Sequence, residues 1–75
     1  MDSTETIGTR MYSECLRLWG SIYRAAKELG VSQPMIIYRW GRGISCPQAY
    51  FMAKILKAGA DIKYILTGER ENELP

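Results

Sequence analysis

The side chains of this chain that could do chemistry are suited to recognising a partner rather than to transforming a substrate. The amide of Gln33 can donate and accept hydrogen bonds together, and hydroxyl and cationic groups flank it in the sequence at Ser21, Arg24, Lys27, Ser32, Arg39, Arg42 and Ser45. The chain holds no histidine, and its acidic residues between positions 9 and 68 are isolated from one another. Because neither cysteine has a neighbouring base and no glycine-rich loop could hold a nucleotide, we expect neither an enzyme nor a small-molecule substrate.

The two cysteines, Cys15 and Cys46, are far apart in the sequence. A zinc site needs about four ligands, and with neither a CxxC pair nor a histidine we expect no metal and no cofactor. A disulfide stays open as an alternative, but two isolated cysteines favour reduced, packed thiols. No apolar run approaches the ~18 residues of a membrane helix, and the polar start MDSTET lacks the apolar stretch of a secretory signal. We therefore expect a cytoplasmic protein that does not enter a membrane.

Basic residues exceed acidic ones in the middle of the chain. The whole chain has a formal net charge of +2, but residues 9–68 contain nine basic and three acidic residues, a net charge of +6. The other acids lie at the two ends, at Asp2, Glu5, Glu69, Glu71 and Glu73. A basic body with acidic ends is typical of a domain that binds a polyanion, although an ordinary solvated surface would give a similar imbalance.

Helical periodicity and helix-breaking residues predict one all-α domain of five short helices in this chain of 75 residues. We expect the helices over residues 9–19, 21–29, 32–40, 47–58 and 61–67. We expect a flexible arm at residues 1–8, the domain at residues 9–68, and a flexible acidic tail at residues 69–75. Helix starts are predicted at the caps Ser21, Ser32 and Asp61, with Ser45 or Cys46 ahead of Pro47.

Apolar residues at helical spacing indicate which faces enter the core. The fourth helix has a stripe at i, i+3, i+4 and i+7, formed by Ala49, Met52, Ala53 and Leu56. The other core candidates are Met11, Cys15, Leu18 and Trp19 in the first helix, Ile22, Ala25, Ala26 and Leu29 in the second, and Ile62, Ile65 and Leu66 in the fifth.

The segment SIYRAAKELGVSQPMIIYRWGRG, residues 21–43, has the spacing of a helix-turn-helix. Ala26 is small enough for a second helix to cross closely, and Gly30 can take the positive φ that closes the first helix. Val31 would fill the turn from inside, Ser32 would cap the next helix, and Ile36 would return to the core. Such a motif presents the outer side of its second helix to the major groove of DNA.

Two segments, AAKELGVSQPMIIYRW and ILKAGADIKYILTGER, resemble the DNA-binding domains of phage repressor and Cro-type regulators, the lambda-repressor-like family. The resemblance implies a five-helix bundle, operator binding, and action as a dimer on a palindromic site, within the nucleoid of a bacterium or a phage-infected host. Two positions depart from the family pattern. Ile22 stands where many members have a phosphate-binding glutamine. In the family, a tryptophan usually follows the buried aliphatic residue of this helix by three positions. Here Trp40 lies four residues after Ile36, or three after Ile37.

With Ile36 in the core, the outward positions of the third helix are Ser32, Gln33, Pro34, Ile37 and Tyr38. The Gln33 amide can pair with N6 and N7 of adenine, and the same position commonly contacts a base in the family. Ile37 could contact thymine methyl groups, and the Tyr38 hydroxyl could reach a phosphate or base edge. In the alternative register, Ile37 is a core residue. Independently of the register, the alternative for Gln33 is a side chain that faces only water.

Phosphate contacts are expected from cations and hydroxyls on either side of that helix. The candidates are Arg39, Arg42 and Ser45 at its end, and Ser21, Arg24 and Lys27 on the preceding helix. Solubilising charge is the alternative for any of them.

The favoured function is sequence-specific transcription regulation of the repressor or Cro type, through double-stranded operator DNA. The alternative is a protein-interaction module, such as an antitoxin or antirepressor, that keeps this fold without operator recognition. Its apolar docking surface would then comprise Ile37, Tyr38, Tyr64 and Leu74. For a homodimer, we expect the fifth helix to form the contact, with Tyr64 off the core stripe.

Overall fold

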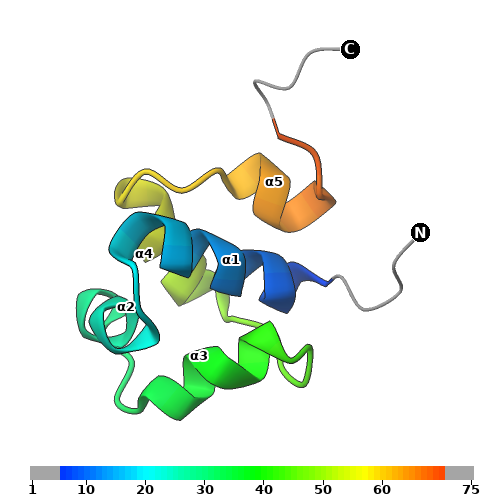
Figure 1. Cartoon of the computed structure of the whole chain (residues 1–75). Coiled ribbons are helices and arrows are strands. Elements are labelled where there is room, and N and C mark those ends of the chain that lie inside the picture. Colours follow the sequence, from blue (N-terminus) through cyan, green and yellow to red (C-terminus); the bar gives the residue numbers. More distant parts are fainter. Residues whose placement is uncertain (1–5, 71–75) are drawn as a thin grey trace.

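The computed structural model describes residues 6–70, and within them the chain forms five α-helices and no strand. The helices are α1 (Ile7–Trp19), α2 (Ile22–Leu29), α3 (Pro34–Gly41), α4 (Ala49–Lys57) and α5 (Ile62–Thr67) (Figure 1). The all-α prediction is therefore confirmed for this part of the chain.

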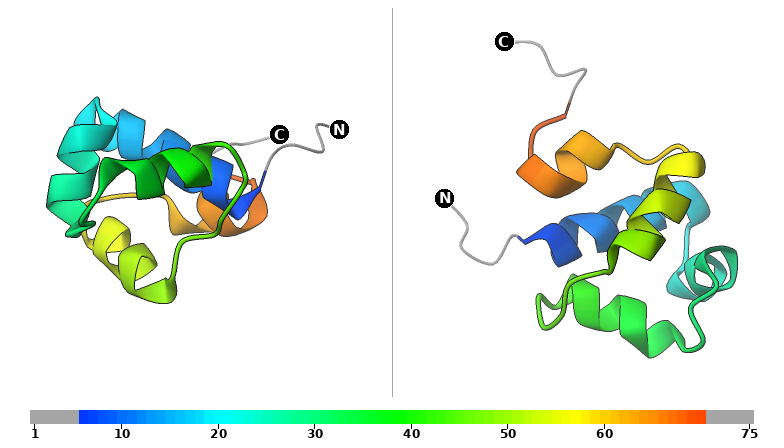
Figure 2. Two further views of the ribbon diagram at one scale, coloured as in Figure 1. Left: turned by 90° about the horizontal axis from the view of Figure 1, so that it is seen from below. Right: turned by 180° about the vertical axis from the view of Figure 1, so that it is seen from behind.

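Helix α1 is the centre of the bundle. It contacts α2, α3 and α5, and Figure 1 shows it between α5 on one side and α3 on the other. Helix α4 contacts α2 and lies behind α1 in that view; the two further views in Figure 2 show it from below and from behind. Helices α3 and α5 therefore occupy opposite sides of α1.

Several predicted helix ends are confirmed. The Ser21 side chain accepts a hydrogen bond from the Arg24 amide at 3.2 Å, and Asp61 Oδ1 accepts one from the Tyr64 amide at 2.9 Å. Gly30 and Gly68 end α2 and α5 with φ of 77° and 84°. These are left-handed conformations that glycine adopts without steric cost.

The first helix begins earlier than predicted. Thr6 and Thr9 form a reciprocal capping box, so that residues 7 and 8, which we expected in the arm, make the first turn of α1. The rest of the expected arm, residues 1–5, and residues 71–75 of the expected tail lie outside the described residues.

The third and fourth helices begin later than predicted. Helix α3 starts at Pro34, with Gln33 as its N-cap and no side-chain capping bond, so the prediction that Ser32 caps this helix is wrong. The cause is Pro34, because the residue before a proline is sterically disfavoured from helical conformation, and Gln33 is extended with φ −136° and ψ 129°. Helix α4 starts at Ala49 after Gln48, which provides no side-chain cap, so neither Ser45 nor Cys46 is its cap.

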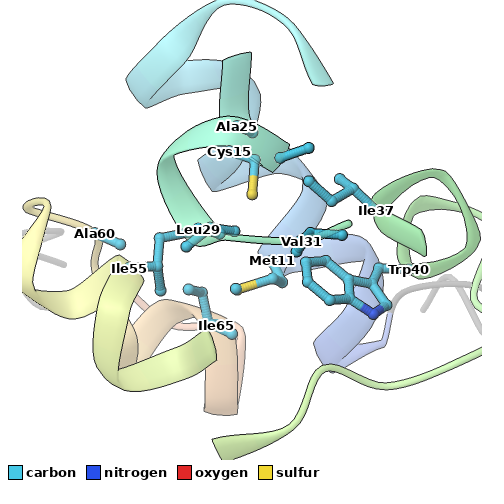
Figure 3. Packing of buried hydrophobic residues seen from close by; sticks show 11 residues of the cluster. Met11, Cys15, Ala25, Leu29, Val31, Ile37, Trp40, Ile55, Ala60 and Ile65 are labelled. Carbon is cyan, nitrogen blue, oxygen red and sulfur yellow. The ribbon is translucent and has the colours of Figure 1, made fainter. Parts of the chain in front are cut away.

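The later start of α3 changes which isoleucine is buried. Ile37 is fully buried and Ile36 only partly, so the prediction of Ile36 as the core residue is wrong and the alternative register is confirmed. Ile37 and Trp40 are three residues apart and therefore lie on one face of α3. Figure 3 shows both side chains among the labelled core residues, near Met11 and Val31.

The predicted core stripe of α4 is wrong in most of its positions. Ala49 and Ala53 are exposed and Leu56 is 55% exposed, whereas Ile55 is fully buried with Phe51 and Met52 partly buried beside it. The ring of Phe51 packs 5.8 Å from that of Trp40, which orients this face of α4 toward the bundle. In α5, Ile65 is buried and Ile62 partly buried, but Leu66 is exposed, contrary to its predicted core position.

Candidate functional site

The outer side of α3 is the candidate site, and α1 determines its position. Gly41 of α3 lies against Tyr12 of α1, since a Cβ at Gly41 would be 2.7 Å from the Tyr12 ring. The ring of Tyr38 meets the same Tyr12 ring edge-on, with 6.5 Å between centroids. At the same end of α3, a Cβ at Gly8 would lie 2.7 Å from the Ser45 carbonyl oxygen and 2.9 Å from that of Trp40. Two glycines thus let α1 and α3 approach closely.

Polar and basic side chains lie along α3 and on the residues that flank it. Ser32, Gln33, Tyr38, Arg39 and Arg42 are exposed, as is Ser45 in the following loop. Gln33 makes no capping bond, so its amide is available to a partner. The structure therefore leaves the predicted hydrogen-bonding groups of this helix accessible.

Apolar side chains form a hollow beside these groups, between the first turns of α2 and α3. Its volume is about 250 Å³, and it is lined by Ile22, Tyr23, Pro34, Met35 and Tyr38. The most accessible of these are Tyr23, Met35 and Tyr38, which are 73%, 59% and 45% exposed. We refer to these five residues as the α2–α3 hollow.

Four cations lie on α2, on α3 and just after α3. Arg24, Lys27, Arg39 and Arg42 are exposed, and within residues 6–70 none of them forms an ion pair. The sequence has no acidic residue between Glu28 and Asp61, so nothing on α3 or in the loop after it offsets Arg39 and Arg42. Every formal charge on α3 and in the loop after it is therefore positive.

The structure therefore leaves some of the predicted site residues accessible and buries or engages others. Ile37 is a correction: it is fully buried, so it cannot lie on the outer face, and this follows from the start of α3 at Pro34. Pro34 is partly buried in the hollow, and the Ser21 hydroxyl is engaged as the cap of α2. Met35 was not among the expected outward positions, but the register of α3 leaves it exposed, and Ile22, expected in the core, lines the hollow with it.

A second polar cluster, at α1 and α5, was not predicted. Glu14 is fully buried and accepts hydrogen bonds from Arg17 at 2.8 and 3.0 Å, from Arg70 at 3.1 Å and from the Asp61 amide at 3.0 Å. Burial alone would raise the pKa of Glu14, but these hydrogen bonds and the Arg17 charge outweigh it and lower the pKa from 4.5 to about 2. We call these four residues the Glu14 cluster. It neutralises a buried charge and has no open ligand position.

The cysteines differ from each other. Cys15 is buried, and burial followed by the nearby Glu14 charge raises the pKa of its thiol to about 12, so it is unreactive. Cys46 is also a free thiol but is exposed, so the expectation of a packed thiol is wrong there. Within residues 6–70, no three potential metal-ligating side chains come together. The helices in that range are also too short or too polar to cross a membrane.

A scan against protein-family models finds no match for this chain, and searches of curated proteins and of solved structures find none either.

Proposed function

We propose that this protein is a sequence-specific DNA-binding transcription regulator of the phage repressor or Cro type, with a lambda-repressor-like fold. The observation that carries the proposal is α3 with its flanking residues, where exposed hydrogen-bonding groups are combined with cations that form no ion pair within residues 6–70, and where the segment itself has no acidic residue. Such a surface complements the phosphates and base edges of a duplex.

The connection between α2 and α3 supports a helix-turn-helix. Gly30 has a left-handed φ of 77°, Val31 is buried behind it, and Ala26 is buried on α2. Figure 1 views α2 almost along its axis while α3 lies across the picture, so the two helices point in clearly different directions. A buried corner of this kind lets the first helix support the second against the duplex.

In the proposed complex, α3 enters the major groove with its first turn toward the bases. The Gln33 amide would contact adenine N6 and N7, a pairing that contributes about 1–3 kcal/mol of discrimination against a wrong base. Arg39 and Arg42 lie at the other end of α3, where they would contact phosphates, as would Arg24 and Lys27 from α2. Ser32, Ser45 and Tyr38 are exposed and would add hydroxyl contacts.

The test begins by selecting bound duplexes from random DNA with the full chain. The dissociation constant for the selected duplex is then measured by fluorescence anisotropy across a salt series, for the wild-type chain and for Arg39→Ala and Arg42→Ala. Each variant should bind more weakly and reduce the slope of log K against log salt by about 1, because one phosphate contact is lost. Lys57→Ala is the matched control, because Lys57 is an exposed cation at the end of α4, outside α2, α3 and the α5 surface proposed below for the dimer. Weak, salt-insensitive binding without an enriched sequence would refute the proposal.

We further propose that the protein acts in the cytoplasm as a homodimer on a palindromic operator, and represses by occupying promoter sequence. We keep α5 as the dimer surface, although the Tyr64 ring is partly buried and covered by the Arg70 guanidinium at 3.9 Å. Leu66 is 49% exposed and is the more accessible apolar residue of this helix. Sedimentation equilibrium of the full chain should show a dimer, and a monomer at high concentration would contradict this arrangement.

A second candidate is a protein-interaction module, and the α2–α3 hollow favours it because exposed apolar side chains suit a protein partner. The docking surface differs from the one expected, since Ile37 is buried and Leu74 lies outside the described residues. A stable complex with a partner protein that survives both Arg39→Ala and Arg42→Ala would favour this candidate over DNA binding.

A further inference from the structure

We propose that the α2–α3 hollow receives the 5-methyl groups of thymine in the major groove, and that the protein therefore selects its DNA through thymine methyls as well as through hydrogen bonds. This inference rests on the proposed DNA-binding function and assigns the hollow a specific contact within it.

The lining of the hollow determines what kind of group it can accept. Ile22, Pro34 and Met35 offer no side-chain hydrogen-bond donor, and the hydroxyl is the one polar group on each of the two tyrosine side chains. A polar base edge placed here would lose hydrogen bonds to water without replacement. The hollow therefore favours an apolar group.

The charges around the hollow indicate which partner would bring that group. Arg24 lies next to Tyr23 on α2, and Arg39 lies next to Tyr38 on α3; both are exposed and neither forms an ion pair within the described residues. An apolar hollow formed by two helices that also carry such cations fits a polyanion with apolar groups. In the major groove, the thymine C5-methyl is the apolar group that base edges present.

Met35 gives the hollow the ability to adapt to that methyl. Its side chain is 59% exposed, and an unbranched thioether adjusts readily to an irregular apolar surface. Met35 is the second residue of α3, so it lies within the first turn, two residues after Gln33. A thymine read by Met35 and an adenine read by Gln33 could then be neighbours along the groove.

The experiment compares duplexes that differ only in methyl groups. The duplex selected from random DNA is prepared with thymine and with deoxyuridine, replaced one position at a time, and binding is measured by fluorescence anisotropy. At one or more positions, removal of the methyl should weaken binding by the wild-type chain about fourfold, the effect of one buried methyl or methylene group. Met35→Ala should weaken binding to the thymine duplex and reduce the difference between thymine and uracil at the same position. Leu56→Ala, an exposed apolar truncation on α4 outside the hollow, should retain the full difference.

The outcomes separate the inference from the function on which it rests. Failure to bind any duplex would overturn the DNA-binding proposal itself. Specific binding with equal affinity for thymine and uracil at every position would overturn only the methyl contact. A methyl effect that stays unchanged in Met35→Ala would also overturn it, because the effect would then arise outside the hollow. If wild type and Met35→Ala bind the thymine duplex equally, the hollow has another occupant, such as an apolar side chain of a partner protein.

Discussion

At the scale of single residues, Glu14 is the one polar or charged residue that is buried within residues 6–70. A buried carboxylate without partners would be protonated or would destabilise the fold by several kcal/mol. Here two guanidinium groups and one backbone amide donate to it, and their geometry holds the carboxylate in its charged form. Because Arg17 and Arg70 are themselves partly exposed, they keep part of their hydration, which limits the cost of burying the cluster.

The lowered pKa of Glu14 predicts a specific loss of stability in acid. Its folded-state pKa of about 2 lies below the ordinary 4.5, so its contribution is complete above pH 4.5 and is lost as the pH falls toward 2. Linkage gives that contribution a size on the order of 3 kcal/mol. Urea unfolding followed by circular dichroism at several pH values should show this loss in the wild-type chain. Glu14→Gln should be less stable at pH 7 and should lose less stability between pH 5 and 3.

The matched control for this prediction is Glu28→Gln, since Glu28 is an exposed acid on α2. Its pH dependence should follow that of the wild-type chain. If Glu14→Gln and Glu28→Gln show the same pH dependence, the assignment of the acid transition to Glu14 is wrong.

At the scale of the elements, the packing of α1 on α3 depends on the absence of side chains. Gly8 and Gly41 lie at positions where a Cβ would be within 3.0 Å of the other helix or the loop after it. The neighbours of Gly41 are atoms of the Tyr12 ring, whereas those of Gly8 are backbone atoms of Trp40 and Ser45, which cannot rotate away. Since α3 carries the candidate site, this contact also positions Gln33, Arg39 and Arg42.

Gly8→Ala should therefore destabilise the fold although alanine is the better helix former. Helix propensity alone favours alanine over glycine by about 1 kcal/mol, but overpacking against a backbone costs about 1–3 kcal/mol. We expect a net loss of about 1 kcal/mol or more, measured by urea unfolding. Ser13→Ala, at an exposed position of the same helix, should be neutral or slightly stabilising. A gain in stability in Gly8→Ala would mean that α1 and α3 are not in close contact.

Sequence reasoning identified the helices better than it identified their faces. The ends at Gly30 and Gly68 and the caps Ser21 and Asp61 are local signals, and the structure confirms them. The predicted register of α3 was wrong because positions were counted from Gly30, whereas Pro34 decides where helical conformation can begin.

Other errors have causes that are far away in the sequence. Helix α4 is apolar on two sides, so periodicity could not show that Ile55 and not Leu56 would be buried; that choice depends on packing against other helices. Glu14 has partners 47 and 56 residues away, at Asp61 and Arg70, and no local pattern could indicate them. The polar site residues on and around α3 were predicted correctly as exposed. The exposure of Met35 could be predicted only with the correct register of α3.

At the scale of the whole molecule, the arginines are divided between two sides of α1. On the α5 side, Arg10 donates to the carbonyl oxygens of Ile65 and Leu66, and Arg17 and Arg70 are paired with Glu14. On the α2 and α3 side, Arg24, Lys27, Arg39 and Arg42 have no ion-pair partner within residues 6–70. Arginines that stabilise the fold are thus separated from cations that are available to a polyanion. The involvement of Arg70 also shows that part of the expected tail is packed on the domain.

This division predicts that two arginine substitutions have opposite profiles. Arg70→Ala removes a hydrogen bond to Glu14 and the contact with the Tyr64 ring, and should lower the free energy of unfolding by about 1–2 kcal/mol. Its affinity for the selected duplex, measured well below its unfolding temperature, should stay close to that of the wild-type chain. Arg42→Ala should unfold like the wild-type chain but bind the duplex more weakly, with a smaller salt dependence. Thermal unfolding and fluorescence anisotropy on the same samples test both halves. If both variants lose affinity and stability together, the two sides of α1 do not have separate roles.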